Sequence, residues 1–316
     1  MKLLLLSRQH VESLVDVSRA IAAVEEAFAA HGRAETIMPP KTLLELPHHR
    51  GDFRAMPGYF AGSVGVKWVN SHPENPTRHG LPSVMALFIL SDPATGAPLA
   101  LLEATLLTAL RTGAAAAVAS RHLAAGPPRT LGILGCGAQS VYVVEAHRAL
   151  WPEVQLRCAD IDRDAAERLA DRFDGQAVSI EEIGRVDVLC TLTPSRRPLV
   201  RRAWLSEPIH INAMGADAPG KQELDPQILI DARIFLDDLE QASASGEVNV
   251  PLATGMLPRD RIAGTLGEVI AGRRQGRAEA AITVFDSTGL AIQDTAVARA
   301  VYEAARERGI GRVVEL

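Results

Sequence analysis

The stretch Thr130-Leu-Gly-Ile-Leu-Gly-Cys-Gly-Ala-Gln-Ser140 decides the fold of this chain. It starts as a short apolar run, typical of a buried strand, and a helical pattern follows directly after Gly135-Cys-Gly137. A dinucleotide pyrophosphate needs this order, because the glycines permit a tight turn and a close backbone approach. The helix amino terminus then offers free N–H groups to the phosphates. Ser140 replaces the usual third glycine, so a plain strand–turn–helix remains the alternative interpretation.

An acidic residue follows at the distance that a dinucleotide-binding domain uses. The run 154–159 predicts a second strand, and Asp160 comes directly after it. Its carboxylate would hydrogen-bond ribose hydroxyls and repel a 2′-phosphate, which favours NAD over NADP. Asp162 is a second candidate, and Arg157 and Arg163 weaken the preference for NAD. The alternative role for Asp160 is to cap the helix that follows it.

Two hydrophobic patterns divide the chain. From Thr130 onward, apolar runs alternate with helix-like or loop segments, which predicts a doubly wound parallel sheet of the Rossmann type. Before that point, a helix at 18–33 is followed by successive strands without crossover helices, which predicts a separate α+β domain. The expected strands of the Rossmann part are 131–135, 154–159, 186–192, 208–213, 233–237 and 281–286. The expected strands of the first part are 42–46, 52–59, 64–70, 83–91 and 98–103.

The boundary between the two parts is predicted at a helix break. A long helix at 104–124 ends at Gly126-Pro-Pro128, just before the dinucleotide motif. The last helical pattern and the short apolar tail after it indicate a return to the first part. We therefore predict an α/β protein with a discontinuous α+β domain over 1–125 and 291–316 and a Rossmann domain over 126–290.

Composition excludes several functional classes. The net charge of −5 and an aromatic content of 4% argue against nucleic acid and anionic membranes as partners. Cys136, Cys158 and Cys190 lie in apolar runs without metal-ligand spacing, so we predict no metal site and a reducing cytosol. The leucine run at 3–6 is too short for a signal sequence, and no run approaches the roughly 18 apolar residues of a membrane span. We expect a cytoplasmic protein.

One lysine stands in unusual surroundings. Strand alternation in 64–70 places Lys67 on the face opposite Val64 and Trp68, and its neighbours are apolar. A lysine held in a desolvated cleft would have a lowered pKa and could exchange protons with a substrate. The alternative is an ordinary solvent-facing strand lysine.

Two arginines and an aspartate complete the candidate site. Arg111 has apolar neighbours three and four positions away on its helix, so its guanidinium needs an anionic partner or a path to water. With Arg54 and Lys67 it could bind a carboxylate and polarise an adjacent carbonyl or imine, the alternative being surface arginines. Asp217 lies in a loop after the strand 208–213, where α/β sheets bind ligands, and could hold an amino group or relay a proton. A simple turn is the alternative for Asp217.

Many blocks, in order along almost the whole chain, resemble the ornithine cyclodeaminase/μ-crystallin family, and within it the archaeal-type alanine dehydrogenases. The blocks are Met38-Pro-Pro-Lys41, Arg54-Ala-Met-Pro57, Lys67-Trp-Val-Asn-Ser-His-Pro73, Gly80-Leu-Pro-Ser-Val-Met-Ala86, Leu110-Arg-Thr-Gly-Ala114, Gly135-Cys-Gly-Ala-Gln139, His210-Ile-Asn-Ala213, Gly215-Ala-Asp-Ala-Pro-Gly-Lys-Gln-Glu-Leu-Asp225, Asp237-Asp-Leu-Glu-Gln241 and Asp286-Ser-Thr-Gly-Leu-Ala-Ile-Gln-Asp294.

The resemblance implies a homodimer built through the first domain, which would bind the substrate, and NAD(H) bound between domains. It implies reversible, NAD-dependent oxidative deamination of a small L-amino acid, alanine first, to the 2-oxo acid. Arg54 and Arg111 would bind the substrate carboxylate, Lys67 would lie beside the reacting carbon, and Asp217 would serve amine and proton chemistry. The residues implied to bind the cofactor are Gly135, Gly137, Ala138, Gln139 and Asp160.

Three alternatives remain open on the same scaffold. A cyclodeaminase would convert ornithine to proline and ammonia and recycle its NAD in place. A ketimine reductase would reduce a cyclic imine such as pyrroline-2-carboxylate. A catalytically silent small-molecule binding protein is the third, because a fold does not fix a function.

Overall fold

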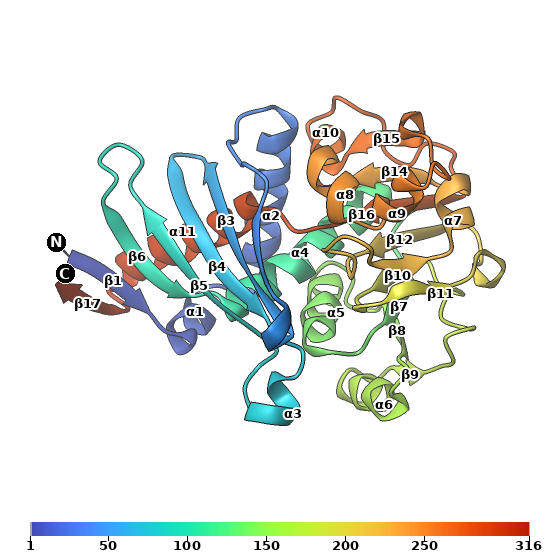
Figure 1. Cartoon of the computed structure of the whole chain (residues 1–316), viewed down its shortest axis with the longest axis horizontal. Coiled ribbons are helices and arrows are strands. Elements are labelled where there is room, and N and C mark those ends of the chain that lie inside the picture. Colours follow the sequence, from blue (N-terminus) through green and yellow to red (C-terminus); the bar gives the residue numbers. More distant parts are fainter. Residues whose placement is uncertain (1, 316) are drawn as a thin grey trace. The chain divides into compact units, whose positions relative to one another are not determined.

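The computed structural model describes residues 2–315, and it divides into two compact units (Figure 1). The first unit comprises Met1–Arg111 and Leu290–Leu316, and the second comprises Thr112–Gly289. The division falls inside helix α4 (Thr105–Leu123), earlier than the glycine–proline break at which the sequence predicted it. Because strands and helices are mixed in both units, the predicted α/β class is confirmed.

The first unit is built on a seven-stranded mixed sheet in the order β17-β1-β6-β5-β4-β3-β2. Strands β1 and β6 run parallel, and all other neighbours are antiparallel. All five strands predicted here are present. The sequence missed β1, whose leucines show no alternation, and β17, which it described only as a short apolar tail. The strands are β1 (Lys2–Leu6), β2 (Thr42–Leu46), β3 (Gly51–Phe60), β4 (Ser63–Ser71), β5 (Val84–Ser91), β6 (Pro98–Glu103) and β17 (Arg312–Glu315).

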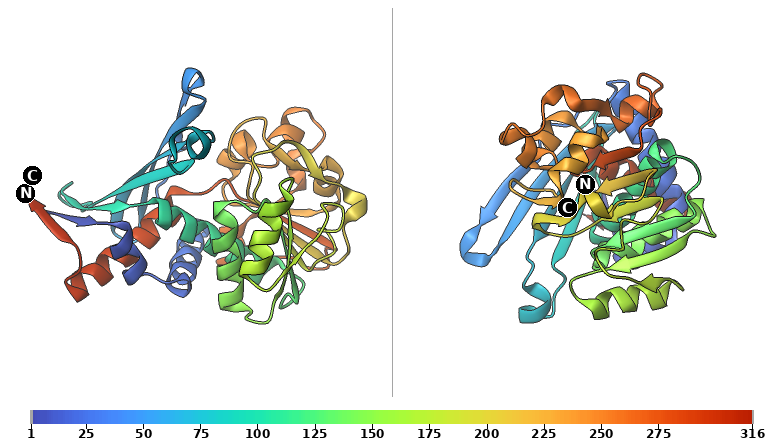
Figure 2. Two further views of the ribbon diagram at one scale, coloured as in Figure 1. Left: turned by 90° about the horizontal axis from the view of Figure 1, so that it is seen from below. Right: turned by 90° about the vertical axis from the view of Figure 1, so that its right-hand side faces the viewer.

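The two faces of this sheet differ. Helix α11 (Ala291–Arg308) lies against one face, which we call the inner face, and α2 (Val17–Gly32) packs against α11 (Figures 1 and 2). The opposite face, which we call the outer apolar face, leaves large apolar side chains between 37% and 50% exposed. By strand register, these side chains are Leu5, Leu44, Trp68, Leu87 and Ile89. Short helices α1 (Arg8–Leu14) and α3 (Asn75–His79) complete the unit.

The second unit contains an eight-stranded, wholly parallel sheet in the order β15-β14-β16-β12-β10-β7-β8-β9. All six predicted strands are present, and the short edge strands β9 and β15 were not predicted. The strands are β7 (Thr130–Leu134), β8 (Gln155–Ala159), β9 (Gln176–Ala177), β10 (Val188–Thr191), β12 (Ile209–Ala213), β14 (Arg233–Leu236), β15 (Ile262–Thr265) and β16 (Ile282–Asp286).

The strand order places a topological switch point between β7 and β10. From β7 the chain proceeds outward to β8 and β9, then returns to add β10 and β12 on the other side. Ligands of doubly wound sheets bind at the carboxyl ends of the strands at such a point. A separate parallel pair is formed by β11 (Arg196–Val200) and β13 (Gln222–Leu224).

Helices and apolar clusters cover the second sheet on both faces. One cluster includes Val143 of α5 and Leu169 of α6. The other includes Ile228 of α7 and Ala242 of α8. Runs of fully buried residues such as those of β12 and β16 need apolar cover on both faces, as the sequence predicted. The helices are α5 (Ala138–Leu150), α6 (Arg163–Arg172), α7 (Pro226–Asp231), α8 (Leu239–Ser245), α9 (Asn249–Ala253) and α10 (Leu266–Ile270).

Candidate functional site

The glycine turn of the second unit lies where the sequence predicted it, between β7 and α5. Gly135 has a φ of +97°, a left-handed conformation that favours glycine. Gly137 is the N-cap of α5 and makes no side-chain capping bond. A Cβ built on Gly137 would meet nothing within 4 Å, and Gly137 and Ala138 are exposed. The helix amino terminus is therefore open to a ligand.

A buried acceptor beside this turn has no partner. The Oε1 atom of Gln139 is buried and makes no hydrogen bond with any residue in the described range 2–315. Such an atom is costly to bury unless water or a ligand donates to it. The exposed glycine backbone can donate to phosphate groups, and the amide oxygen of Gln139 can accept from a hydroxyl group. Together they fit a bound nucleotide.

Asp160 ties the end of β8 to the glycine turn. Its Oδ2 accepts from the backbone N–H of Cys136 at 2.6 Å, and its Oδ1 accepts from Asp162 N at 2.9 Å. The alternative that Asp160 caps the next helix is wrong, because Asp162 is the N-cap of α6 and accepts from Asp164 N. The carboxylate of Asp160 therefore stands beside the open turn.

The neighbouring arginines have other partners. Arg157 donates to the carbonyl oxygen of Arg185 at 2.9 Å, and Arg163 pairs with Glu167 on the exposed side of α6. Neither forms an ion pair with Asp160 in the described part of the chain. Because these two arginines are engaged elsewhere, they weaken the predicted preference for NAD over NADP less than the sequence indicated.

In the first unit, a buried ion-pair cluster connects β4, α4 and α11. Lys67 Nζ lies 2.7 Å from Asp294 Oδ2, and Arg111 Nε lies 3.3 Å from Asp294 Oδ1. Arg111 Nη1 donates to Gln293 Oε1 at 3.3 Å. Lys67 is only 1% exposed and Asp294 is fully buried, so the alternative of a solvent-facing lysine is wrong. Arg111 has the anionic partner that its apolar surroundings require.

The surroundings of Lys67 bring its titration to neutral pH. The pKa of Lys67 is lowered to about 7 overall, first by burial and then by the charges of Arg111 and Lys41. The Asp294 carboxylate opposes them and raises this pKa. A lysine of this kind can take up or release a proton at physiological pH.

Arg54 lies on the same inner face as Lys67. The register pairs Met56 with Lys67 and Arg54 with Val69, so Arg54 is one cross-strand pair away from Lys67. Its guanidinium binds Asp52 through Nε–Oδ1 at 3.0 Å and Nη2–Oδ2 at 3.3 Å, and its side chain is 12% exposed. The alternative of a surface arginine reaching water is wrong for Arg54 and for Arg111, whose side chain is 10% exposed.

Sequence reasoning missed three members of this cluster: Lys41, Gln293 and Asp294. A signal for the last two was available, because they are amide and acid groups in the otherwise apolar start of α11. The charge of Lys41, directly before β2, lowers the pKa of Lys67. All three stand in blocks that carried the family resemblance.

Asp217 belongs to the second unit, in the loop 214–221 after β12. Its Oδ1 accepts from Lys221 Nζ at 2.5 Å, and the Asp217 side chain is 31% exposed. The loop extends from the carboxyl end of a central parallel strand, as predicted. An accessible aspartate paired with a lysine can hold an amino group or move a proton.

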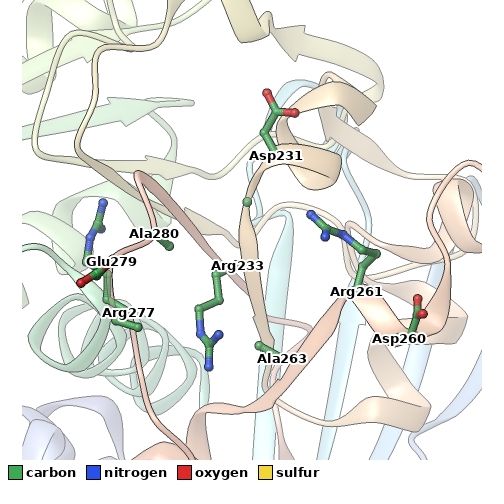
Figure 3. Close-up of a pocket in the computed structure, with 10 residues that line it drawn as sticks. Asp231, Arg233, Asp260, Arg261, Ala263, Arg277, Glu279 and Ala280 are labelled. Carbon is green, nitrogen blue, oxygen red and sulfur yellow. The ribbon is translucent and has the colours of Figure 1, made fainter.

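A cavity of about 480 Å³ in the second unit contains none of the predicted site residues (Figure 3). Its lining comes from the starts of β14, β15 and β16, the edge opposite the carboxyl ends. The guanidinium groups of Arg233, Arg261 and Arg277 point in different directions (Figure 3). Within residues 2–315, no group of three or more metal-ligating side chains is assembled, and no helix is long and apolar enough to cross a membrane.

Comparison with known proteins gives full-length matches. The model of the ornithine cyclodeaminase/mu-crystallin family matches residues 1–309. Alanine dehydrogenase from Archaeoglobus fulgidus is 46% identical over 321 residues, covering 100% of this chain and 99% of that protein. The solved structure of an archaeal alanine dehydrogenase dimer with bound NAD superposes with a TM-score of 0.96 at 46% identity, covering 100% of both chains. Iminosuccinate reductase of Paracoccus denitrificans, solved with NAD+, gives 0.92 at 32% identity, also over 100% of both chains.

Proposed function

The chain belongs to the ornithine cyclodeaminase/mu-crystallin family, and from this premise we propose that it is an NAD-dependent alanine dehydrogenase. L-Alanine, NAD and water would give pyruvate, ammonia and NADH, reversibly. The observation that carries this proposal is the buried cluster of Lys67, Arg111 and Asp294 in a chain 46% identical to an alanine dehydrogenase.

The residues at the glycine turn fit NAD. The open backbone at Gly135 and Gly137 and the amino terminus of α5 would hold the phosphates, with Ala138 and Gln139 beside them. Asp160 would accept from the ribose hydroxyls and disfavour a 2′-phosphate. When bound, NAD accepts a hydride from the substrate α-carbon.

The cations of the first unit supply the substrate contacts. Arg54 and Arg111 would bind the substrate carboxylate through charge-assisted hydrogen bonds. Asp52 already occupies the Nε–Nη2 edge of Arg54, so a substrate carboxylate that binds this edge would displace Asp52. Asp294 keeps Arg111 and Lys67 in fixed positions by pairing with both.

Lys67 is the proton-exchanging group in this proposal. In the deamination direction, neutral Lys67 takes the hydroxyl proton as the carbonyl of pyruvate forms. In the amination direction, protonated Lys67 returns it to the carbonyl oxygen. A pKa of about 7 makes both forms available at neutral pH. Asp217, held by Lys221, would orient the attacking water or take a proton from the amine.

We propose a homodimer formed through the outer apolar face of the first unit. Monomers rarely expose a contiguous apolar surface of this kind, and such surfaces mark interaction sites. A cytoplasmic location is also proposed, and the three cysteines of the chain are free thiols.

A substrate panel tests the function. The purified protein is mixed with L-alanine, L-ornithine, L-lysine or L-proline and either NAD or NADP, and cofactor reduction is followed by absorbance. Pyruvate with ammonia, and pyrroline-2-carboxylate, are tested with NADH. We expect reduction of NAD by alanine and oxidation of NADH by pyruvate with ammonia. Proline formed from ornithine without net NADH would instead establish a cyclodeaminase, and turnover of the cyclic imine alone would establish a ketimine reductase.

A further inference from the structure

Glu223 in β13 is fully buried and accepts four hydrogen bonds. Its Oε1 accepts from both the backbone N–H and the hydroxyl of Thr193, each at 2.7 Å. Its Oε2 accepts from the hydroxyl of Thr191 at 2.7 Å and from the backbone N–H of Gly215 at 2.8 Å. Burial raises the pKa of the Glu223 carboxyl, and the hydrogen bonds from Thr191, Thr193 and Gly215 oppose that rise by favouring the carboxylate.

The donors come from the ends of two adjacent strands. Thr191 ends β10 and Thr193 lies in the loop after it. Gly215 lies in the loop after β12, which pairs in parallel with β10. The two loops touch at Gly215, where an added Cβ would lie 2.1 Å from Thr193 O and 2.6 Å from Glu223 Oε2. Glu223 therefore joins these loops at a point where no side chain fits.

The loop 214–221 is held at its other end too. Asn249 accepts from Gly220 N at 3.0 Å and donates to Lys221 O at 3.0 Å. The strand β13 is itself held by Glu247, which accepts from the backbone N–H groups of Glu223 and Leu224. Asp217 thus lies between an anchor at Gly215 and an anchor at Gly220 and Lys221.

We propose that Glu223 is a positioning residue that fixes the loop carrying Asp217 against the end of β10. It touches neither substrate nor cofactor and acts through Asp217. The expected effects on kcat rest on the proposed function, whereas the expected effects on amide hydrogen exchange do not.

The Glu223→Gln variant isolates the carboxylate. The amide keeps one acceptor oxygen, and its NH₂ group must then face either Thr193 N–H or Gly215 N–H. In either orientation one backbone donor meets another donor, and a backbone N–H cannot rotate away. One of the two loops must therefore detach from β13.

Asp187→Asn is the control for the removal of a hydrogen-bonded carboxylate elsewhere in the same unit. The Asp187 carboxylate also accepts from two backbone N–H groups and a hydroxyl, those of Arg129 and Thr130, but at the amino ends of the strands. All three donors reach the same oxygen, Oδ2, so the amide oxygen of an asparagine can keep them. D187N therefore removes a carboxylate without a donor conflict, far from the loop 214–221 along β10 and β7. Thr191→Val is a milder variant that removes one donor without creating a conflict.

Two measurements decide the inference. Amide hydrogen exchange should become at least tenfold faster within 214–221 in E223Q and stay unchanged there in D187N. With L-alanine and NAD, kcat should fall at least tenfold in E223Q and two- to fivefold in T191V. D187N should keep kcat, because its amide oxygen can still accept from Arg129 and Thr130.

A double-mutant cycle separates positioning from general destabilisation. If Glu223 acts through Asp217, the E223Q/D217N enzyme should be no slower than D217N alone. Additive losses in kcat, or unchanged exchange in 214–221, would overturn the inference. If wild-type protein does not turn over alanine with NAD, the proposed function fails, and the exchange experiment alone decides the role of Glu223.

Discussion

Lys67 and Asp294, 227 positions apart in the sequence, meet in the first unit with 2.7 Å between Nζ and Oδ2. Almost no water reaches either side chain. Removing one partner of such a buried pair leaves an uncompensated charge, at a cost of about 3–5 kcal/mol. The pair therefore fixes the start of α11 against the middle of β4. The Asp294 carboxylate also favours the protonated form of Lys67 by raising its pKa.

Replacing Asp294 with Asn should move the acid limb of the pH profile for alanine oxidation. The carboxylate raises the pKa of Lys67, so its loss lowers a pKa that stands at about 7. Because neutral Lys67 acts in deamination, the limb of kcat should move to lower pH by about one unit or more. The maximal rate should fall as Arg111 loses its partner. Asp294→Glu, which keeps the charge, is the control, and an unmoved limb in D294N contradicts the assignment.

Replacing Lys67 with Met should remove proton exchange and leave the fold intact. The unbranched apolar side chain fits the buried space, and Asp294 keeps Arg111 as a partner. We expect a loss of about 10²–10⁴-fold in kcat in both directions, as for other general acid–base groups. Thermal unfolding monitors the fold, and Lys2→Met at an exposed strand position is the control. Wild-type turnover of pyruvate, ammonia and NADH by K67M would refute the role.

The sequence could identify Lys67 as unusual but could not assign its environment. Alternation placed the lysine opposite Val64 and Trp68, yet both sides of β4 carry apolar residues. Periodicity alone does not say which face a helix covers. The inner face is covered by α11, which lies more than two hundred residues later in the chain. Asp294 was missed for the same reason.

For Arg111 and Asp160, by contrast, the local sequence was enough to single out the residue. Arg111 was singled out because a guanidinium among apolar helix neighbours needs an anion, and Asp294 meets that need. Asp160 was recognised from its spacing after the glycines, a relation set by the local order of strand, turn and strand. Local order also explains why most strands of both sheets were predicted. The exceptions are the edge or near-edge strands β1, β9, β15 and β17, which are short or lack an alternating pattern.

Replacing Asp160 with Asn should weaken NAD binding and relax the choice of nucleotide. The variant loses the negative charge beside the turn and one of the acceptors that hold Cys136 N and Asp162 N. We expect KM for NAD to rise at least tenfold and the NAD/NADP preference to fall, with KM for alanine within twofold of wild type. Asp162→Asn is the control: asparagine caps a helix about as well as aspartate, so this variant should keep both the α6 cap and KM for NAD. The reverse pattern would assign the ribose contact to Asp162.

Stability should fall as the pH drops below about 6.5. Burial lowers the pKa of His147 to about 4 and that of His210 to about 3, from an ordinary value of 6.5. His147 Nδ1 must donate to Val143 O, so its Nε2 accepts from Ser120, which requires the neutral ring. Below pH 6.5 the unfolded chain binds protons that the folded chain does not.

The full contribution of these histidines is therefore present above pH 6.5 and is lost progressively toward pH 4 and then 3. Each should cost about 2 kcal/mol of unfolding free energy at pH 5. Urea unfolding at pH 8, 7, 6 and 5 measures this loss. His147→Gln should flatten the slope, and the exposed His79→Gln should not. Equal slopes in wild type and H147Q would contradict the neutral buried ring.

Replacing Leu87 with Lys should dissociate the proposed homodimer. Leu87 is 49% exposed on the outer apolar face, and a charge there would be buried without a partner in any dimer that uses this face. Light scattering after size exclusion should give the mass of one chain for L87K and of two for wild type. Leu239→Lys, at a 46% exposed leucine in the second unit, is the control and should remain dimeric. If L239K dissociates while L87K does not, the dimer forms through the second unit instead.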